Sequence, residues 1–321
     1  MQLVDIKDLR VSFRHHDGVV SAVRGVTLGL SKGESLGIVG ESGSGKSVTF
    51  LALMRLLQAP AATIEADKLE LDGSDLLNAD AKALSDIRGS LVSMVFQDPM
   101  TSFDPLFTIG YQISETIQTH GNTGKKAALA QARELLAKVE IKHPDRVLKQ
   151  YPHQLSGGML QRAMIAMALS CEPRLLIADE PTTALDVTVQ AQILQLITDL
   201  QQETGMSLII ITHDLGVIAE TVDRVVVMYG GKVMEIGDTR EIFEDPLNPY
   251  TKALIESIPG REAGKRKLIE IPGSSPNALS PPSGCPFHPR CKLADDKCAS
   301  DAPNLSTFGK NRSAACWKVV Q

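Results

Sequence analysis

A glycine-rich segment near the N-terminus has the residue types needed to bind a chain of phosphates. It reads Gly40-Glu41-Ser42-Gly43-Ser44-Gly45-Lys46-Ser47, between a strand-like apolar run, 35–39, and a second apolar segment, 48–57. Strand, glycine loop and helix in that order form a phosphate-binding loop, because consecutive backbone N–H groups can face one anion at a helix N-terminus. We expect Lys46 to reach the β- and γ-phosphates of ATP and Ser47 to hold Mg²⁺. A glycine-rich turn without a ligand is the alternative, which the flanking segments disfavour.

Two carboxylates, Asp179 and Glu180, follow the short apolar run 175–178. In open α/β sheets, ligands bind at the carboxyl ends of the strands, so we expect these residues beside the phosphate loop. Asp179 would hold Mg²⁺ through water, and Glu180 would polarise a water for in-line attack on the γ-phosphate. A plain acidic turn after a strand is the alternative.

Two further polar residues end apolar runs. His213 follows the run 207–212, and Gln97 follows the run 91–96. At the same sheet edge, His213 would contact the γ-phosphate, and the Gln97 amide would contact both Mg²⁺ and the attacking water. The alternatives are a structural histidine and a solvated glutamine at a strand end.

The segment Ser156-Gly157-Gly158 opens another expected helix, which runs to about residue 167. A helix N-terminus again presents backbone donors. The loop 40–47 already cradles the phosphates, so this turn has no task in the chain's own site. It would have one if it capped the nucleotide of a second, facing subunit, and such a pair would close on ATP and open after hydrolysis.

The remaining sequence predicts the elements that position these residues. Residues 1 to about 30 alternate apolar and polar positions between turns, which is typical of a small antiparallel sheet. Residues 100–168 are mostly helical in pattern. Alternating strands and helices then indicate a parallel sheet with right-handed crossovers. These expected elements cover 175–179, 189–202, 207–212, 214–220 and 224–229. Apolar residues at helical spacing in the helical block are Ala128, Leu129, Ala132, Leu135, Leu136 and Val139.

Composition narrows the class of protein. The chain has 321 residues and a net charge of −5, which allows a large core and argues against nucleic-acid binding. No apolar run approaches the ~20 residues needed to span a bilayer, and we expect no signal peptide. The sequence therefore predicts a cytosolic globular enzyme that reaches a membrane only through a protein partner.

Together these segments resemble ABC-type ATPases, in the order and at the spacings typical of that family, over about residues 1–235. The resemblance implies an α/β P-loop NTPase fold with a parallel-sheet core, an N-terminal antiparallel β subdomain and an inserted α-helical subdomain at about 100–168. No catalytic position is degenerate, which implies ATP hydrolysis. The matching segments are the loop 40–47, Gln97, Leu155 to Arg162, Asp179-Glu180, Ala184-Leu185-Asp186 and His213.

The same resemblance implies a head-to-tail ATP sandwich between two subunits. Ser156, Gly157 and Gly158 would bind the γ-phosphate on the partner's loop, and Asp186 would communicate between the two sites. Phe13 matches the position whose aromatic ring stacks on adenine. That position is often tyrosine in the family, and phenylalanine keeps the stacking face but loses the hydroxyl.

The segment 245–254 resembles one typical of the ATPases of dipeptide, oligopeptide and nickel importers. This implies a peripheral subunit at the cytoplasmic face of the bacterial inner membrane that uses ATP to drive import. Its partners would be two transmembrane permease subunits, an extracytoplasmic solute-binding protein and a second ATPase chain, paralogous rather than identical. The helical region and the loop after Gln97 would grip the permease. A non-transport ABC ATPase and a redox-gated ABC ATPase remain alternatives, and the solute stays open.

The last part of the chain comprises an expected extension and linker, 236–280, and a cysteine-rich tail, 281–321. Four of the five cysteines lie in this tail, with gaps of 5, 6 and 17 residues and no Cys-x-x-Cys pair. Such spacing favours an iron–sulfur cluster over a zinc ribbon, and the tail also resembles those of peptide-importer ATPases that carry a 4Fe-4S cluster. Zinc, free thiols and disulfides remain alternatives. The expected ligands are Cys285, Cys291, Cys298 and Cys316.

We expect this metal site to be structural, because the tail is too poor in apolar residues to form its own core. Because the tail lies far in sequence from the catalytic motifs, we expect no electron transfer to the nucleotide. Loss of a single tail cysteine should loosen the tail and lower assembly with the membrane subunits more than ATP binding. The fifth cysteine, Cys171, is expected to be a small buried residue of the nucleotide core.

Overall fold

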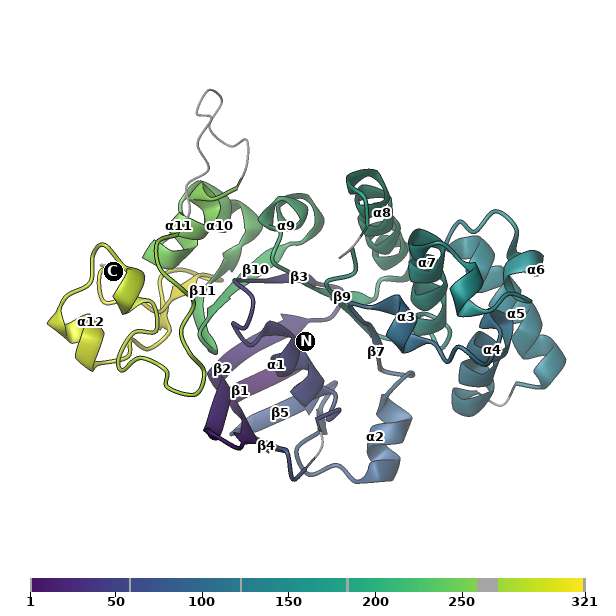
Figure 1. Ribbon diagram of the computed structural model, residues 1–321, viewed down its shortest axis with the longest axis horizontal. Helices are drawn as coiled ribbons and strands as arrows, with labels where there is room; N and C mark the ends of the chain where they lie inside the picture. Colours follow the sequence, from purple (N-terminus) through teal and green to yellow (C-terminus); the bar gives the residue numbers. More distant parts are fainter. Residues whose placement is uncertain (1, 58, 122, 183–184, 259–270, 320–321) are drawn as a thin grey trace. The chain divides into compact units, whose positions relative to one another are not determined.

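The computed structural model describes residues 2–57, 59–121, 123–182, 185–258 and 271–319 (Figure 1). The chain divides into two compact units. The first unit comprises 1–31, 35–78 and 211–321, and the second comprises 32–34 and 79–210. No helix in the described ranges combines the length and the apolar character that a bilayer crossing requires.

An antiparallel sheet opens the first unit, as the alternating N-terminal pattern predicts. Its central strand β1 carries residues that alternate between fully buried and exposed sides, including Val4 and Ile6, both 0% exposed. Strands β2, β4 and β5 all pair antiparallel with β1, and β6 pairs with β5. The strands are β1 (Gln2–His15), β2 (Gly18–Ser31), β4 (Ala62–Glu65), β5 (Lys68–Leu71) and β6 (Ser74–Asp75).

A second group of strands in this unit has the order β12-β13-β11-β10-β3. Strand β3 is buried along its whole length and lies parallel to β10, which fits an inner strand of a covered sheet. The remaining pairs are antiparallel. The strands are β3 (Ser35–Val39), β10 (Arg224–Tyr229), β11 (Lys232–Asp238), β12 (Ser306–Thr307) and β13 (Ser313–Ala314).

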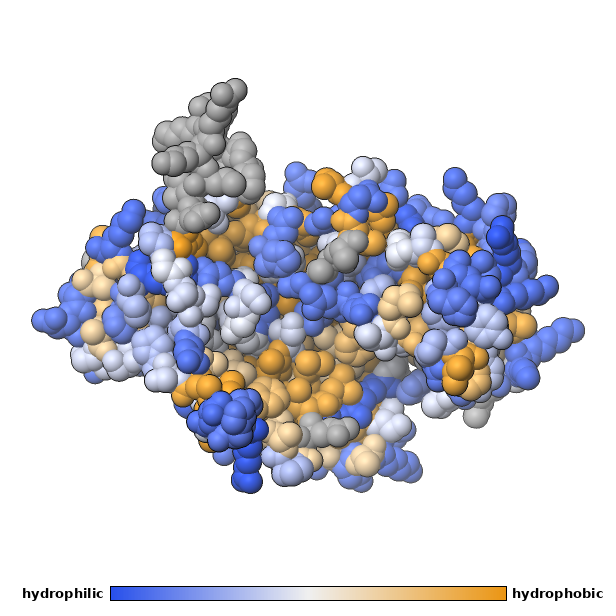
Figure 2. All heavy atoms as spheres, in the orientation of Figure 1, coloured by the Kyte–Doolittle hydropathy of each residue, from blue (hydrophilic) through white to orange (hydrophobic). Residues whose placement is uncertain are grey.

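Helices of the first unit accompany these strands. Helix α1 directly follows the glycine loop and contacts both β1 and β2. Figure 2 shows apolar residues gathered at the surface of this unit over α1, β1 and β5. The helices are α1 (Lys46–Leu53), α9 (Leu215–Thr221), α10 (Thr239–Glu244) and α11 (Pro249–Glu256).

The second unit contains a parallel strand pair and most of the helices. Strands β7 (Val92–Val95) and β8 (Leu175–Asp179) run parallel, with Val95 opposite Ala178. Strand β9 (Ser207–Thr212) begins in this unit and ends in the first. Helix α2 (Ala81–Ile87) precedes β7, and α8 (Val187–Thr204) follows β8.

The block 99–168 is helical, as its pattern predicts, and α4, α5 and α7 contact one another. Ala128, Ala132 and Leu136 of α5 are fully buried, whereas Leu129 is 44% exposed and so lies outside the core that the spacing suggests. Cys171 after α7 is half-buried rather than buried. The helices are α3 (Pro99–Ser102), α4 (Ile109–His120), α5 (Lys125–Lys138), α6 (Pro144–Val147), a 3-10 turn at Pro152–Gln154 and α7 (Gly157–Ala168).

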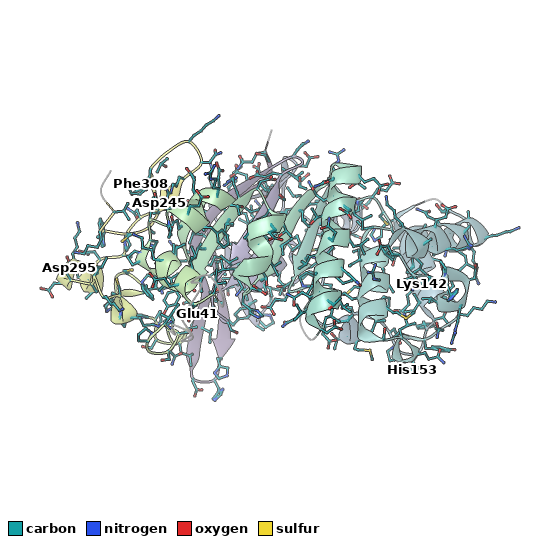
Figure 3. All side chains as sticks on the ribbon, turned by 90° about the horizontal axis from the view of Figure 1, so that it is seen from above. Glu41, Lys142, His153, Asp245, Asp295 and Phe308 are labelled. Carbon is teal, nitrogen blue, oxygen red and sulfur yellow. The ribbon has the colours of Figure 1, made fainter. Side chains whose placement is uncertain are left out.

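The cysteine-rich tail belongs to the first unit rather than forming a unit of its own. Its strand β13 pairs with β11, where Ala314 lies opposite Glu235. A 3-10 turn (His288–Arg290) and helix α12 (Asp296–Ser300) precede this strand. Asp295, labelled in Figure 3, caps α12 and forms an ion pair with Lys318. The tail is therefore held in place by the pairing of β13 with β11 and by the cap of α12.

Candidate nucleotide-binding site

The phosphate loop in the first unit requires glycine at two positions. Gly40 has φ 148°, and a Cβ atom there would lie 2.1 Å from the carbonyl oxygen of Met228. Gly45 has φ 94°, and its Cβ would lie 2.5 Å from the carbonyl oxygen of Ala22. Both backbone atoms belong to neighbouring strands, so no side chain could give way. The close approach holds the loop against the sheet.

The two ends of the loop differ in exposure. Ser42 and Gly43 are exposed, whereas Ser44, Gly45 and Lys46 are buried. The Lys46 ammonium group is inside the loop, where it donates to the carbonyl oxygens of Gly40 (2.8 Å) and Glu41 (3.0 Å). Ser47, in the first turn of α1, is half-buried. A cation and the amides of a helix N-terminus therefore share one concave backbone segment, which suits a phosphate chain.

Ser44 gives independent support for a ligand in this loop. Its side chain is 3% exposed, and its hydroxyl oxygen has no hydrogen-bond partner among the described residues. A buried hydroxyl without a partner costs about 1–3 kcal/mol, so such groups need an explanation. A phosphate oxygen bound in the loop would supply the missing partner.

The first unit also contains two other expected site residues. His213 directly follows β9 and is exposed. Phe13 lies on β1 between Val20 of β2 and Ala62 of β4, and its ring is half-buried.

The second unit brings Gln97 and Glu180 together. Val95 and Ala178 are opposite each other on the parallel strands β7 and β8, and the two polar residues each lie two positions further along. Because both residues follow the paired positions by two residues, their side chains lie on the same side of the two strand ends. The Gln97 amide nitrogen donates to a Glu180 carboxylate oxygen at 2.9 Å.

Asp179 and Glu180 are adjacent but differ in backbone and burial. Asp179 is the last residue of β8 and is 7% exposed, whereas Glu180 is half-buried and has φ 46°. A left-handed conformation at a residue other than glycine costs about 1–3 kcal/mol and is common at functional sites. The strand therefore ends at Asp179, and the backbone turns at Glu180.

The Ser156-Gly157-Gly158 turn begins α7 in the second unit, as expected. Ser156 caps the helix by accepting a hydrogen bond from the Met159 amide at 3.4 Å. Ser156 and Gly157 are exposed. A Cβ on Gly158 would lie 3.0 Å from the Cγ1 atom of Val189 on α8, so this glycine permits close packing of the two helices.

Asp186 caps α8 by accepting a hydrogen bond from the Val189 amide at 3.0 Å, and its residue is exposed. The sequence predicts a helix from 189, and the cap explains why it begins two residues earlier. Ala184, part of the same motif, lies outside the described residues.

The four tail cysteines line one small pocket, together with Phe287, His288 and Trp317. All four are free thiols. Burial raises the pKa of Cys285 to about 11 and also raises the pKa values of Cys298 and Cys316. Sulfur donors that are far apart in sequence, Cys285, Cys291, Cys298 and Cys316, therefore face a common space.

The tail also contacts the phosphate loop, which no pattern in the sequence predicts. Arg290 lies between two of the cysteines and forms an ion pair with Glu41, with 2.8 Å between Nη1 and Oε2. The two residues are 249 positions apart. Neither periodicity nor motif spacing carries information about such a pair.

Comparisons with known proteins agree with this geometry. Residues 23–183 match the family described as "ABC transporter", and residues 234–298 match "Oligopeptide/dipeptide transporter, C-terminal region". The chain is 48% identical over 317 residues to a probable peptide ABC transporter ATP-binding protein of Sinorhizobium fredii, covering 98% of this chain and 95% of that protein. It is 48% identical over 315 residues to the oligopeptide transport ATP-binding protein OppD of Haemophilus influenzae, covering 98% and 97%.

Among solved structures, the chain is similar to the ATP-binding cassette MJ0796, whose dimer has been determined in a post-hydrolysis state with ADP and Pi. The identity is 28% and the TM-score is 0.64, covering 74% of this chain and 99% of the cassette.

Proposed function

Because the chain belongs to the ABC transporter family, as an ATP-binding subunit of its oligopeptide/dipeptide group, we propose that it hydrolyses ATP to drive import of peptides or related small solutes through a membrane permease. The observation that carries the proposal is the likeness to peptide-transport ATP-binding proteins along 98% of the chain. The buried lysine and the unpartnered Ser44 hydroxyl of the phosphate loop provide the chemical basis.

The residues of the site divide the chemistry of hydrolysis among them. The loop amides, Lys46 and Ser44 bind the phosphates, and His213 contacts the γ-phosphate. Ser47, Gln97 and Asp179 would hold Mg²⁺, which would neutralise charge on the phosphates. Glu180 accepts a proton from the attacking water, and its bond with Gln97 fixes the direction of the carboxylate. Phe13 stacks on the adenine ring.

Hydrolysis requires a second subunit. The exposed turn at Ser156, Gly157 and Gly158 binds the γ-phosphate held by the partner's loop, and Asp186 links the two sites. The dimeric form of the related MJ0796 cassette supports this arrangement. We assign the partner as a paralogous ATPase chain in preference to a second copy.

The permease contact is formed by the segment after Gln97 and the helices that follow it, up to about residue 150. Four large apolar side chains are exposed in this short segment: Met100 (51%), Leu106 (77%), Phe107 (43%) and Tyr111 (41%). An exposed apolar cluster bordered by polar residues is typical of a protein–protein contact. Two permease subunits would cover it, with the subunit peripheral at the cytoplasmic face of the inner membrane and an extracytoplasmic protein delivering the solute.

The cysteine pocket holds a 4Fe-4S cluster with a structural role. A single tetrahedral zinc with Zn–S bonds of about 2.3 Å requires sulfurs about 3.8 Å apart. The only group of three or more metal-binding side chains within 4.8 Å of one another among the described residues is His15, His16 and Asp17, all exposed, so no three cysteine sulfurs approach as closely as zinc demands. The four cysteines line one pocket, as a cubane cluster held by four cysteine ligands requires.

Reconstitution tests the transport function. The chain should copurify with two membrane proteins, and proteoliposomes containing the complex should take up a dipeptide or oligopeptide only when ATP is supplied. Lys46→Ala should abolish uptake, while the matched control Lys292→Ala, at an exposed lysine of the tail, should not. ATPase activity from a chain that associates with no membrane protein would contradict the proposal.

A further inference from the structure

We infer that the tail shapes the phosphate loop through Arg290, a positioning residue for ATP binding, so that the order of the cysteine pocket sets the affinity for ATP. The inference rests on the proposed ATP-binding function, and it assigns to the tail a role in the nucleotide site itself.

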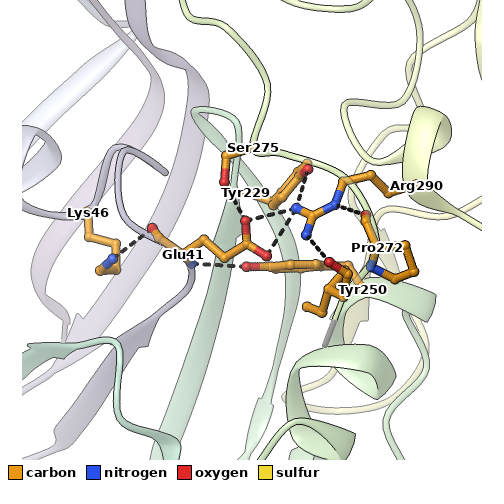
Figure 4. Close-up of polar contacts among 8 residues, drawn as sticks. Glu41, Lys46, Tyr229, Tyr250, Pro272, Ser275 and Arg290 are labelled. Carbon is orange, nitrogen blue, oxygen red and sulfur yellow. Dashed lines mark hydrogen bonds and ion pairs between the residues drawn. The ribbon is translucent and has the colours of Figure 1, made fainter. Parts of the chain in front are cut away.

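The Arg290 side chain makes hydrogen bonds in several directions (Figure 4). Its Nη1 donates to both carboxylate oxygens of Glu41, at 3.0 and 2.8 Å, and to the Tyr229 hydroxyl at 3.0 Å. Its Nε donates to the carbonyl oxygen of Pro272 at 2.7 Å, and its Nη2 donates to that of Ile271 at 3.0 Å. The side chain is 7% exposed. A guanidinium fork can serve these acceptors together, which a lysine ammonium cannot do.

Glu41 connects this network to the catalytic lysine. Its carboxylate accepts from Arg290 and from the Ser275 hydroxyl, and its amide nitrogen donates to the Tyr250 hydroxyl at 3.0 Å. Its carbonyl oxygen accepts from Lys46 at 3.0 Å. Groups of the C-terminal region therefore hold Glu41 on one side. On the other side, the carbonyl oxygen of Glu41 holds the ammonium group of the phosphate-binding Lys46.

The charge of Glu41 makes this contact important for ATP. A carboxylate in the loop would repel a triphosphate, and the repulsion is strong because the side chain is only 22% exposed. Arg290 neutralises the carboxylate and turns it toward the tail. Without the guanidinium, a partly buried negative charge would remain beside the phosphates.

The same segment of the tail leads into the cysteine pocket. Phe287 packs against Tyr229 and Tyr250, with ring centroids 5.4 and 5.2 Å apart, and it also lines the pocket. Arg290 directly precedes Cys291, another pocket residue. Anything that orders the cysteines therefore orders Arg290, and loss of that order would release it from Glu41.

Equilibrium binding of Mg²⁺-ATP to the full chain tests the role of Arg290. Arg290→Met should raise the Kd about 10-fold or more, since it leaves a partly buried carboxylate unpaired. Adding Glu41→Gln to Arg290→Met should bring the Kd back to within about 3-fold of Glu41→Gln alone, because the charge to be neutralised is gone. The control Lys292→Met removes an exposed tail cation and should leave the Kd unchanged.

Wild-type affinity in Arg290→Met would overturn the inference, and so would an Arg290→Met defect that Glu41→Gln leaves in place. Arg290→Lys is the control for misfolding, because it keeps the positive charge and loses only the forked N–H donors of the guanidinium group. It should retain the wild-type melting temperature and show a smaller rise in Kd, and a Kd equal to that of Arg290→Met would contradict the charge argument.

Cys291→Ser tests the link to the pocket. It should raise the Kd for ATP in the wild-type background and have little effect in the Glu41→Gln background, whereas the control Cys171→Ser, outside the tail, should change neither. An unchanged Kd in Cys291→Ser would overturn this link. Iron content measured on the same anaerobic samples separates the outcomes, because an iron-free wild-type chain refutes the cluster and leaves the Arg290 result standing.

Discussion

The phosphate loop and the Ser156-Gly157-Gly158 turn are both glycine-containing helix starts, yet their surroundings differ. The loop is enclosed by its own unit, with Gly45 and Lys46 buried and Glu41 held by the tail. Two residues of the turn are exposed, and the Ser156 side chain caps the helix. A segment that is enclosed by its own chain can form a binding site alone, whereas an exposed segment can bind a ligand that another subunit holds. One enclosed segment and one exposed segment are what a nucleotide site shared between two subunits requires.

The largest effect is expected from Glu180→Gln, which separates binding from hydrolysis. Removing a general base typically costs a factor of about 10²–10⁴ in turnover. ATP affinity should persist, because the loop is untouched, and the chain should accumulate in its ATP-bound, associated form. Steady-state ATPase assays check this, with Glu172→Gln at an exposed carboxylate as the control. ATPase activity above half that of the wild type would show that Glu180 is not the general base.

Ser156→Arg tests the role of the exposed Ser156-Gly157-Gly158 turn. Its bulk should fill the γ-phosphate pocket of the partner and reduce the ATPase rate of the assembled complex at that site by about 10-fold or more. The control His153→Arg places the same group at an exposed position three residues earlier (Figure 3) and should have little effect. Equal losses in both variants would show that the turn has no special task.

Leu106→Asp tests the proposed permease contact at the exposed apolar residues after Gln97, which belong to neither glycine segment. Placing a charge in an apolar contact costs several kcal/mol at the centre of an interface, so ATP-driven uptake should fall severalfold while basal ATPase activity is spared. Leu293→Asp, at a 57% exposed leucine of the tail, is the matched control. Crosslinks from the permease that map only to the tail would contradict the assignment.

Phe13→Ala should have the smallest effect on turnover at saturating ATP, because stacking on adenine contributes to the affinity for ATP and not to the chemical step. Loss of an aromatic face is worth about 1–3 kcal/mol per stacked base, so the Kd for ATP should rise about 5- to 100-fold. Phe13→Tyr should bind as tightly as the wild type. If Phe13→Ala and wild type bound ATP equally, adenine would have to lie elsewhere.

Most of the nucleotide core could be predicted because its signals are local. Strand, glycine loop and helix are contiguous in sequence, and Gln97, Asp179 and His213 all follow short apolar runs that are strands in the structure. Apolar periodicity likewise located β9, α9 and β10, with boundaries within one residue.

The contacts between distant segments could not be predicted. The hydrogen bond from Gln97 to Glu180 depends on the register of β7 and β8, which the sequence does not encode locally. The pairing of β13 with β11 involves two-residue matches that no periodicity reveals. The ion pair between Arg290 and Glu41 likewise joins residues that no local pattern connects.

We propose that the phosphate loop binds the chain's own nucleotide and that the Ser156-Gly157-Gly158 turn binds a neighbour's. Light scattering of the Glu180→Gln chain with its partner ATPase, with and without Mg²⁺-ATP, measures whether two chains associate on ATP. We predict ATP-dependent association of two ATPase chains, which Ser156→Arg abolishes without changing the Kd for ATP of the isolated chain. A Ser156→Arg chain that no longer binds ATP by itself would contradict the account, because the turn would then belong to its own site.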